Sequence, residues 1–418
     1  MVGLQWGDEG KGKVVDVLTE RADAVIRYQG GANAGHTVYV GERKFVLHHL
    51  PSGVLRSNTL AILGNGMVVE PRTLMEEVSR LDPEARERIY VSERAHLVLP
   101  QHVALDRARE GASARPIGTT LRGIGPTYEA KYARSGLRVG DLRRRDFLRD
   151  EFPERLRAAG VSDAEEIDRA RSDCQRLLDD LGGRIVDAQA LLQDLDAKGA
   201  RFLFEGAQGS LLDVDFGTYP FVTSSTPSFL GLGPGTGFSP RRIDHVLGVT
   251  KVYCTRVGEG PFPSEVHGET ANQLRTAGGE FGSTTGRPRR CGWLDLPALR
   301  FAIQLNDVDS LALTKADVLA GRDTVPVVVG YRRGGVVANG IPFDARDFDG
   351  VEAIVEQWPG WSVATPEAMA PFTALLERHL ERRVSVLSTG RMRSDVVLRA
   401  PFGIDAAPAP DSEPWRPR

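Results

Sequence analysis

A glycine-rich loop near the start of the chain is the first group of residues that could do chemistry. It runs from Gln5 to Lys13 as Gln-Trp-Gly-Asp-Glu-Gly-Lys-Gly-Lys, between a predicted strand and a predicted helix. Backbone N–H groups at such a turn, together with the dipole of the following helix, form a binding site for phosphate. The loop differs from G-x-x-x-x-G-K-[ST], because Gln5 replaces the first glycine and Gly12 replaces the hydroxyl residue that binds magnesium. We therefore expect phosphate binding without the usual magnesium ligand.

Asp8 lies inside this loop, where a carboxylate would repel phosphate groups. It would be favourable there if it held a cation or exchanged a proton with a substrate. The structural alternative is a simple Asp-Glu-Gly turn between strand and helix. Three glycines and two lysines surround this aspartate in the loop, and they favour the functional interpretation.

A second glycine-rich segment follows the next predicted strand, with the sequence Gly-Gly-Ala-Asn-Ala-Gly-His-Thr from Gly30 to Thr37. Adjacent strand ends in an α/β sheet open onto a common crevice, so His36 could face Asp8. Glycines around His36 would let a substrate approach its ring closely. Most single histidines are structural, and we keep that interpretation for His48, His49, His245, His267 and His379.

Two further motifs follow predicted strands and suit a guanine base. The strand before Thr314 delivers Lys315 and Asp317 as Thr-Lys-Ala-Asp, which resembles the [NT]-K-x-D guanine signature. An aspartate there can accept hydrogen bonds from N1–H and the 2-amino group of guanine, which adenine lacks. The alternative is a charged surface turn. Because Ser388-Thr-Gly390 follows a later strand and could close the other edge of the base, we predict a guanine nucleotide.

The loop from Gly282 to Arg290 reads Gly-Ser-Thr-Thr-Gly-Arg-Pro-Arg-Arg. Its arginines and hydroxyl groups suit a substrate that carries a carboxylate or a phosphate. A solvated basic turn is the alternative, but Gly286 and Pro288 restrict the backbone, and an apolar segment follows directly. Glu205-Gly-Ala-Gln-Gly209 adds another polar turn after a strand, with an ordinary tight turn as its alternative.

The elements that must position these motifs alternate between strand and helix. Apolar strands are predicted at residues 1–4, 24–28, 60–63, 88–91, 201–204, 246–254, 310–313, 325–331 and 384–387, with helices at 11–22 and about 74–81 and a hairpin at 37–49. This order predicts an α/β fold with a mostly parallel central sheet covered by helices, similar to phosphate-loop NTPases, with hairpin and helical insertions.

The chain has 418 residues, of which 41% are hydrophobic, enough for a large core. We expect residues 1–404 to form a single catalytic domain with a helical arm at about 141–198, and residues 405–418 to form a disordered tail. Long loops rich in glycine and proline at 217–240 and 258–290 are expected to be functional.

A formal net charge of -3 argues against a general nucleic-acid binder. Cys174, Cys254 and Cys291 are far apart and form no motif, which fits a reducing cytosol. No apolar run approaches 18 residues, and no charged-then-apolar leader opens the chain. We therefore expect a cytoplasmic protein that is neither secreted nor bound to a membrane.

Taken together, the motifs of residues 1–404 resemble those of the adenylosuccinate synthetase family. The motifs that carry the resemblance are Trp6–Lys13, Asn33–Thr37, Gly118–Thr120, Arg122–Pro126, Glu205–Gly209, Thr284–Arg287 and Thr314–Asp317. Two places depart from the family pattern: Leu121 interrupts Thr-Thr-Gly-Arg-Gly, and Thr226–Leu230 replaces a small, polar stretch.

The resemblance implies a GTP-dependent ligase that joins L-aspartate to inosine monophosphate (IMP). Asp8 would remove the proton from N1 of IMP, so that O6 attacks the γ-phosphoryl group of GTP and gives 6-phosphoryl-IMP. The amino group of aspartate would then displace phosphate, with His36 as the acid and Gln208 as a further catalytic residue. Magnesium would be held by Asp8 and the carbonyl of Gly35.

The resemblance also implies the binding residues. Those for GTP are Gly7, Asp8, Glu9, Gly10, Lys11, Gly12, Lys13, Gly35, His36, Thr37, Arg289, Lys315, Ala316, Asp317, Ser388, Thr389 and Gly390. Those for IMP are Asp8, Glu9, Gly10, Lys11, Asn33, Ala34, Gly35, His36, Thr120, Arg134, Gln208, Thr223 and Arg287. Those for aspartate are Ser283, Thr284, Thr285, Gly286, Arg287, Pro288 and Arg289. Arg134 would reach the IMP of a neighbouring subunit, which implies a homodimer.

Two alternatives remain open from the residues alone. A GTPase switch would share the phosphate loop and the Thr-Lys-x-Asp motif, but it would not need Asp8, His36 or the arginine loop. A different nucleotide-dependent ligase would act on another purine and another amino acid.

Overall fold

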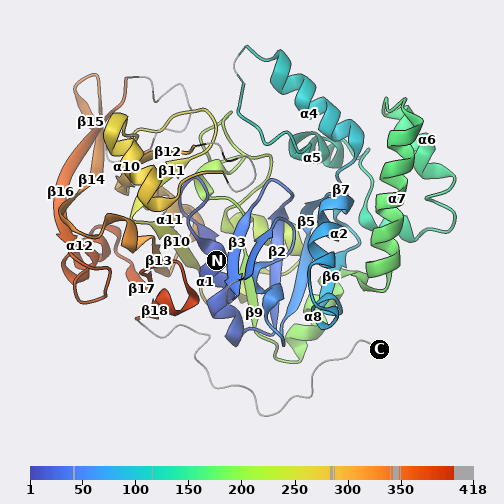
Figure 1. Ribbon diagram of the computed structural model, residues 1–418, viewed down its shortest axis with the longest axis horizontal. Coiled ribbons are helices and arrows are strands. Elements are labelled where there is room, and N and C mark those ends of the chain that lie inside the picture. The colour runs from blue at the N-terminus through green and yellow to red at the C-terminus, as the bar shows by residue number, and fades with distance from the viewer. Residues whose placement is uncertain are drawn as a thin grey trace.

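The computed structural model describes residues 1–40, 43–114, 116–282, 286, 288–338, 340–341, 348 and 350–399. Two sheets form its centre (Figure 1). In the first sheet the strand order is β8-β6-β5-β2-β9, with β7 beside β5, and every pair is parallel. Its strands are β2 (Ala24–Gly30), β5 (Leu60–Val69), β6 (Ile89–Ser92), β7 (His96–Leu97), β8 (Ile185–Val186) and β9 (Phe202–Glu205).

The second sheet has the order β1-β10-β13-β17-β18, and only β18 runs antiparallel to its neighbour. Its strands are β1 (Val2–Gly3), β10 (Leu247–Lys251), β13 (Ser310–Thr314), β17 (Arg383–Ser388) and β18 (Val396–Leu398). Gly206 N donates a hydrogen bond to Met1 O (3.0 Å) just after β9. The neighbouring edges of the two sheets are joined there.

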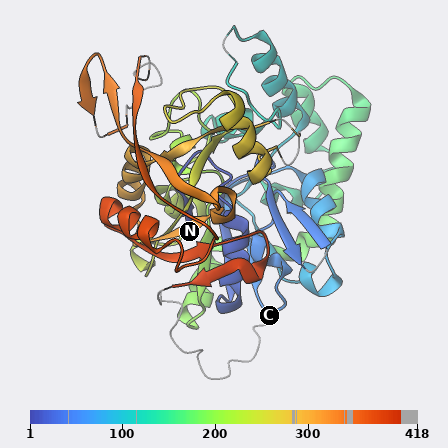
Figure 2. The same ribbon diagram turned by 60° about the vertical axis from the view of Figure 1, so that its left-hand side comes forward.

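A third sheet and a hairpin lie beside this centre. The third sheet contains β11 (Tyr253–Arg256), β12 (Arg290–Asp295), β14 (Arg322–Arg333), β15 (Val336–Ala338) and β16 (Glu352–Trp361). The hairpin pairs β3 (His36–Val40) with β4 (Arg43–Leu47). Figures 1 and 2 show β14, β15 and β16 at one end of the molecule, away from α6 and α7 at the other.

Helices cover the sheets, as expected where parallel strands are buried on both faces. They are α1 (Lys11–Leu18), α2 (Pro71–Ser79), α3 (Pro83–Arg86), α4 (Pro100–Ala112), α5 (Ile124–Tyr132), α6 (Glu151–Ala158), α7 (Ala164–Leu181), α8 (Ala188–Ala197), α9 (Leu232–Thr236), α10 (Gly268–Gly278), α11 (Leu296–Asn306) and α12 (Ala370–Leu380). None of the helices in the described ranges combines the length and the apolar character needed to cross a membrane.

Helix α1 is the element that fixes the phosphate loop over the second sheet. Gly10 precedes it with a φ of 82°, a left-handed conformation that glycine adopts without a steric penalty. The apolar side chains Val14, Val15 and Leu18 are buried in a cluster with Val249 of β10 and with Ala312 and Val386 from β13 and β17. The loop therefore lies at the carboxyl ends of these strands, where α/β proteins bind their ligands.

The stretch predicted as a helical arm at 141–198 packs against the first sheet and its helices. Helices α6 and α7 bury Phe152 and Leu177 in the same apolar cluster as Leu74 of α2. Strand β8 pairs with β6 at the edge of the first sheet, and α8 contributes Leu192 to the cluster under β2. The division into one domain with an arm stays a prediction. The disordered tail predicted at 405–418 lies outside the described residues.

The predicted α/β class is confirmed, but two elements differ from the expectation. The helix predicted at 11–22 ends at Leu18 and continues as one 3-10 turn, Thr19–Arg21. The strand predicted at 246–254 is divided at Val252: β10 pairs with β13, whereas β11 pairs antiparallel with β12 in another sheet. A continuous apolar run does not reveal such a change of sheet, because both halves are buried.

Candidate active site

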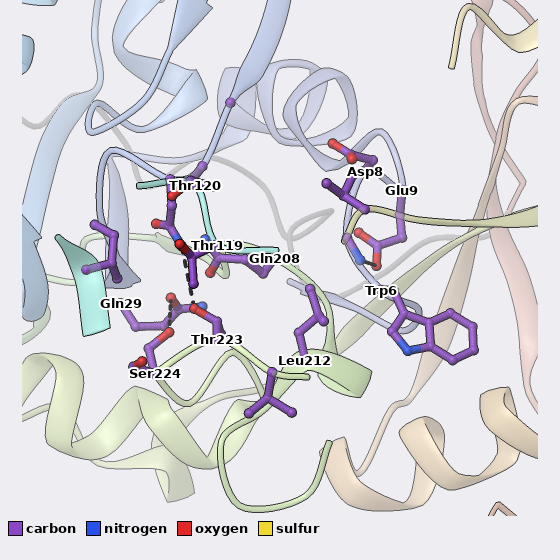
Figure 3. Close-up of a pocket in the computed structure, with 18 of the residues that line it drawn as sticks. Trp6, Asp8, Glu9, Gln29, Thr119, Thr120, Gln208, Leu212, Thr223 and Ser224 are labelled. Atoms are coloured by element: carbon purple, nitrogen blue, oxygen red, sulfur yellow. Dashed lines mark hydrogen bonds between the residues drawn. The ribbon is translucent and has the colours of Figure 1, made fainter. Parts of the chain in front are cut away.

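One cavity of about 1470 Å³ collects the predicted motifs. This volume exceeds that of a typical pocket for one small molecule, so it has room for two nucleotides. Predicted site residues that line it are Gly7, Asp8, Glu9, Gly10, Lys11, Gly12, Lys13, Asn33, Ala34, Gly35, His36, Thr120, Gln208, Thr223, Arg289, Lys315, Asp317, Ser388 and Gly390. Figure 3 shows Asp8 and Glu9 on one side, Thr120, Thr223 and Ser224 on the other, and Gln208 between them.

Other predicted site residues lie outside the cavity lining or outside the described residues. Thr37, Ala316 and Thr389 are chain neighbours of lining residues, and Gly286 and Pro288 belong to the arginine loop. Arg134 is exposed after α5 and does not line the cavity of its own chain. Ser283, Thr284, Thr285 and Arg287 lie outside the described residues.

The phosphate loop is held in shape by the side chain of Glu9. Its Oε1 accepts hydrogen bonds from Gln5 N (3.1 Å) and Gly7 N (2.9 Å), and its Oε2 accepts one from Lys11 Nζ (2.5 Å). Lys11 Nζ also donates to the carbonyl of Gln208. The sequence motif did not reveal this structural role of Glu9, because the carboxylate of a loop residue gives no sign of turning back into its own loop.

The phosphate loop and the guanine motif are tied to each other. The hydroxyl of Thr314 donates to Glu9 O (2.6 Å), and Lys13 Nζ donates to Gly390 O. Burial lowers the pKa of Lys13 to about 8, although Asp395 and Asp317 oppose this shift. These hydrogen bonds fix the distance between the phosphate loop and the guanine motif. A ligand that contacts both would therefore bind to two segments that are already held in place.

Within the described part of the chain, Asp8 is the one residue of the phosphate loop whose carboxylate contacts the arginine loop. Its backbone is left-handed, with a φ of 59°, and its side chain is 30% exposed. Oδ2 lies 3.0 Å from Arg289 Nε. The carboxylate is thus open to the cavity and also neutralised by a cation.

His36 begins β3 beside a buried carboxylate. Its Nδ1 lies 3.4 Å from Glu205 Oε1, and Ser52 N (2.8 Å) and Ser52 Oγ (2.9 Å) donate to the same carboxylate. Burial, followed by the charges of Arg27 and Lys11, lowers the pKa of His36 well below its usual value. Burial raises the pKa of Glu205. These surroundings therefore favour a neutral imidazole.

Several buried polar atoms in the cavity have no hydrogen-bond partner among the described residues. These atoms are Oε1 and Nε2 of Gln208, Oδ1 of Asp317 and Oγ of Ser388. A buried polar group without a partner costs roughly 1–3 kcal/mol. Gln208 also has a φ of 54°, a conformation that non-glycine residues adopt rarely. Unpaired polar atoms and local strain at one cavity are characteristic of a ligand site.

The loop that carries Thr223 is anchored by Arg256, which is 1% exposed. This guanidinium donates to Thr218 Oγ1 (3.0 Å) and to the carbonyls of Phe221 (2.9 Å) and Pro261 (2.7 Å). Asn33 Nδ2 lies 3.5 Å from Thr223 Oγ1 across the cavity. The residues at 217–223 are thus held by a buried cation that the sequence motifs did not single out.

The two departures from the family pattern have defined structures. Leu121 takes a left-handed φ of 55° with its side chain 39% exposed, the conformation that a glycine would adopt more easily. In the segment Thr226–Leu230, Ser228 N donates to Asp213 Oδ2 (3.2 Å) and Phe229 N donates to Asn306 Oδ1 (2.7 Å). Both changes leave the cavity open.

Comparison with known proteins decides among the possible nucleotide enzymes. The family model described as adenylosuccinate synthetase matches residues 1–397. The chain belongs to the adenylosuccinate synthetase family. It is 45% identical to an adenylosuccinate synthetase of Pasteurella multocida (strain Pm70), over 96% of this chain and 98% of that protein. It is 46% identical to that of Proteus mirabilis (strain HI4320), with the same coverage.

A solved structure supports the same assignment. The fully ligated adenylosuccinate synthetase from Plasmodium falciparum is 35% identical and superposes with a TM-score of 0.90, over 96% of this chain and 99% of that chain. The protein is therefore a GDP-forming ligase. It joins L-aspartate to IMP with GTP, through 6-phosphoryl-IMP, and releases adenylosuccinate, GDP and phosphate in AMP biosynthesis.

Proposed function

We propose that this cavity carries out the ligase reaction with Asp8, His36 and Gln208 as its catalytic residues. The observation that carries the proposal is that these residues line one cavity with both the phosphate loop and the guanine motif. GTP would place its base between Asp317 and Ser388–Gly390 and its phosphates along Gly7–Lys13. The unpaired oxygens of Asp317 and Ser388 would then gain partners.

IMP would occupy the other part of the cavity, against Asn33, Thr120, Gln208 and Thr223. The free amide of Gln208 can hydrogen-bond to the purine, since neither of its polar atoms has a partner in the described part of the chain. Asp8 would accept the proton of N1, so that the electron pair of O6 attacks the γ-phosphorus and GDP leaves. Phosphorylation turns O6 into a good leaving group, which the amino group of aspartate then displaces as phosphate.

His36 would act on the transferring phosphoryl group. Burial and nearby cations lower its pKa and favour a neutral ring. The negative charge of the phosphoryl oxygens would oppose that shift, and Glu205 beside Nδ1 would stabilise a charged ring. His36 can then donate a proton or a hydrogen bond where charge develops.

Magnesium would be held by Asp8 and the carbonyl of Gly35, which both line the cavity. No group of three or more acidic, histidine or cysteine side chains suited to a metal occurs among the residues that the structure describes. Mg²⁺ commonly takes only one or two carboxylates and completes its shell with water and substrate phosphates. When bound, the ion would neutralise charge on the phosphoryl oxygens.

L-Aspartate would bind to the loop Ser283–Arg289, whose arginines suit its carboxylates. Phe281 forms a β-bridge with Pro288 at the base of this loop, and Arg289 faces the cavity. We further propose that residues 1–404 form one catalytic domain of a cytoplasmic enzyme. Its active unit would be a homodimer in which the exposed Arg134 reaches the IMP of the neighbouring subunit.

Two measurements test this proposal. Asp8→Asn and His36→Asn should each lower kcat by about 100- to 10,000-fold, the usual contribution of acid–base catalysis, while circular dichroism stays unchanged. Near-normal turnover by either variant would reject the role of that residue. Phosphate release should also require IMP and L-aspartate together; rapid GTP hydrolysis with neither present would instead indicate an uncoupled GTPase site.

A further inference from the structure

A buried carboxylate lies directly beneath the arginine loop, and the proposed mechanism does not use it. Glu280 follows α10 and Gly279, and it is fully buried. Its N–H donates to Arg275 O (2.8 Å), and its carbonyl accepts from Arg289 N (3.0 Å). Glu280 and Arg289 therefore close the base of the loop that carries the proposed aspartate-binding residues.

The side chain of Glu280 is held from several directions. Its Oε2 accepts a hydrogen bond from Arg289 Nη1 (2.7 Å). Its Oε1 accepts one from the hydroxyl of Tyr253 and lies 3.3 Å from Nζ of Lys251. Burial alone would raise the pKa of Glu280, but Lys251, Lys315 and Arg289 lower it to about 2. The carboxylate is therefore ionised at neutral pH and has little freedom to move.

Arg289 is shared unequally between two carboxylates. Toward Glu280 it makes a hydrogen-bonded ion pair through Nη1. Toward Asp8 its Nε lies 3.0 Å from Oδ2, but Nε makes no hydrogen bond within the described residues. The contact with Asp8 is thus electrostatic without good hydrogen-bond geometry, and it is the weaker of the two.

The same carboxylate also lies beside the guanine motif. Nζ of Lys315 is 4.0 Å from Glu280 Oε1, and it donates to Gly278 O (2.7 Å) in the turn that precedes Glu280. Lys315 and Arg289 both line the cavity, whereas Glu280 does not. Glu280 therefore lies behind the wall of the cavity, between Lys315 of the guanine motif and Arg289, the residue that contacts Asp8.

We infer that Glu280 is a positioning residue that fixes the guanidinium of Arg289, so that Arg289 can pass from Asp8 to the phosphoryl oxygens of bound GTP. Its hydrogen bond to Glu280 stays in place during this exchange, because only the loosely held Nε side changes partner. Asp8 is then released to accept the proton of N1. The inference rests on the proposed roles of Asp8 and Arg289.

A purely structural role for Glu280 gives a different expectation. Lys251 is fully buried, and a nearby carboxylate is needed to balance its charge. If that were all, loss of the Glu280 charge would harm the enzyme equally whether or not Arg289 were present. A positioning role instead makes the effect depend on Arg289.

A double-mutant cycle with Glu280→Gln and Arg289→Gln separates the two roles. Glu280→Gln alone should lower kcat/KM for GTP by about 100-fold, the scale expected when a catalytic group is misplaced by about 1 Å. The KM for IMP should stay within about three-fold. In the Arg289→Gln background the same change should cost less than about three-fold. Equal losses in both backgrounds would overturn the inference.

Tyr253→Phe is the matched control, because it removes one donor to Oε1 and leaves the pair with Arg289 in place. Its kcat/KM should stay within about three-fold of the parent enzyme. Should Glu280→Gln fail to fold, Glu280→Asp is carried through the same cycle, since it keeps the charge near Lys251 but withdraws it from Arg289. An active Asp8→Asn variant would reject the proposed base, whereas additive losses in the cycle would reject only the role of Glu280.

Discussion

The hydroxyl of Thr314 donates a 2.6 Å hydrogen bond to the carbonyl of Glu9, and so connects the guanine motif to the phosphate loop. Both residues are buried. Thr314 ends β13, and Glu9 lies in the loop that follows β1, the strand on the other side of β10 in the same sheet. The two segments that we propose bind the base and the phosphates of GTP therefore hold each other in place.

Thr314→Val should remove the hydrogen bond between the two segments while preserving the shape of the side chain. We expect the KM for GTP to rise by about 5- to 10-fold and the free energy of unfolding to fall by about 1–2 kcal/mol, because Glu9 O loses its donor. Steady-state kinetics and urea denaturation measure the two effects. Thr373→Val on α12 removes a comparable buried hydroxyl far from the cavity, so it should lower stability with no change in KM.

Gln208→Ala should separate stability from activity. The amide of Gln208 is buried without partners in the described part of the chain, and its loss removes an unsatisfied group. We expect an unchanged or higher Tm together with a fall in kcat of about 100-fold, the scale of losing one preorganised donor. Gln29→Ala provides the comparison, since its amide donates to Ala207 O (2.8 Å) and its loss should lower Tm. A Gln208→Ala variant that keeps full kcat would contradict the catalytic role.

Asp295 should make stability depend on pH. Burial raises its pKa to about 6 from an ordinary value of 3.8, although the hydroxyl of Tyr331 opposes the shift. Between these two pH values the folded state binds a proton that the unfolded state has released, so stability falls as pH rises through this window.

Asp295→Asn keeps an acceptor for Tyr331 and Ala298 but carries no charge. The wild-type protein should therefore lose about 3 kcal/mol relative to this variant between pH 4 and pH 7 in chemical denaturation. A difference that does not vary with pH would show that Asp295 does not titrate in this range.

The sequence motifs predicted much of the site because they end strands. Strand β13 covers the predicted 310–313 with one residue more, and β17 covers 384–387 with one residue more at each end. Since parallel strands bring their carboxyl ends to one edge, Asp317 and Ser388 were expected in one place, and both line the cavity. Local sequence is therefore enough to place a site residue when that residue directly follows a predicted strand.

The supporting residues could not be predicted in this way. Arg256 and Glu280 have partners far away in the sequence, such as Thr218 for Arg256 and Lys251 for Glu280, and nothing in their own neighbourhoods marks them as buried charges. Arg256, for example, donates to Thr218 Oγ1 and to the carbonyl of Phe221, in a loop that lies more than thirty residues before it. Such contacts depend on how β11 leaves β10 for another sheet, which an apolar run does not encode.

The internal hydrogen bonds of Glu9 have a consequence for the order of events in catalysis. Its carboxylate accepts hydrogen bonds from the amides of Gln5 and Gly7, so contacts within the loop itself fix its curvature. Preorganised recognition avoids the entropy loss of ordering a flexible segment. Because this loop is shaped by its own residues, its ordering would not require the purine acceptor to bind before the nucleotide.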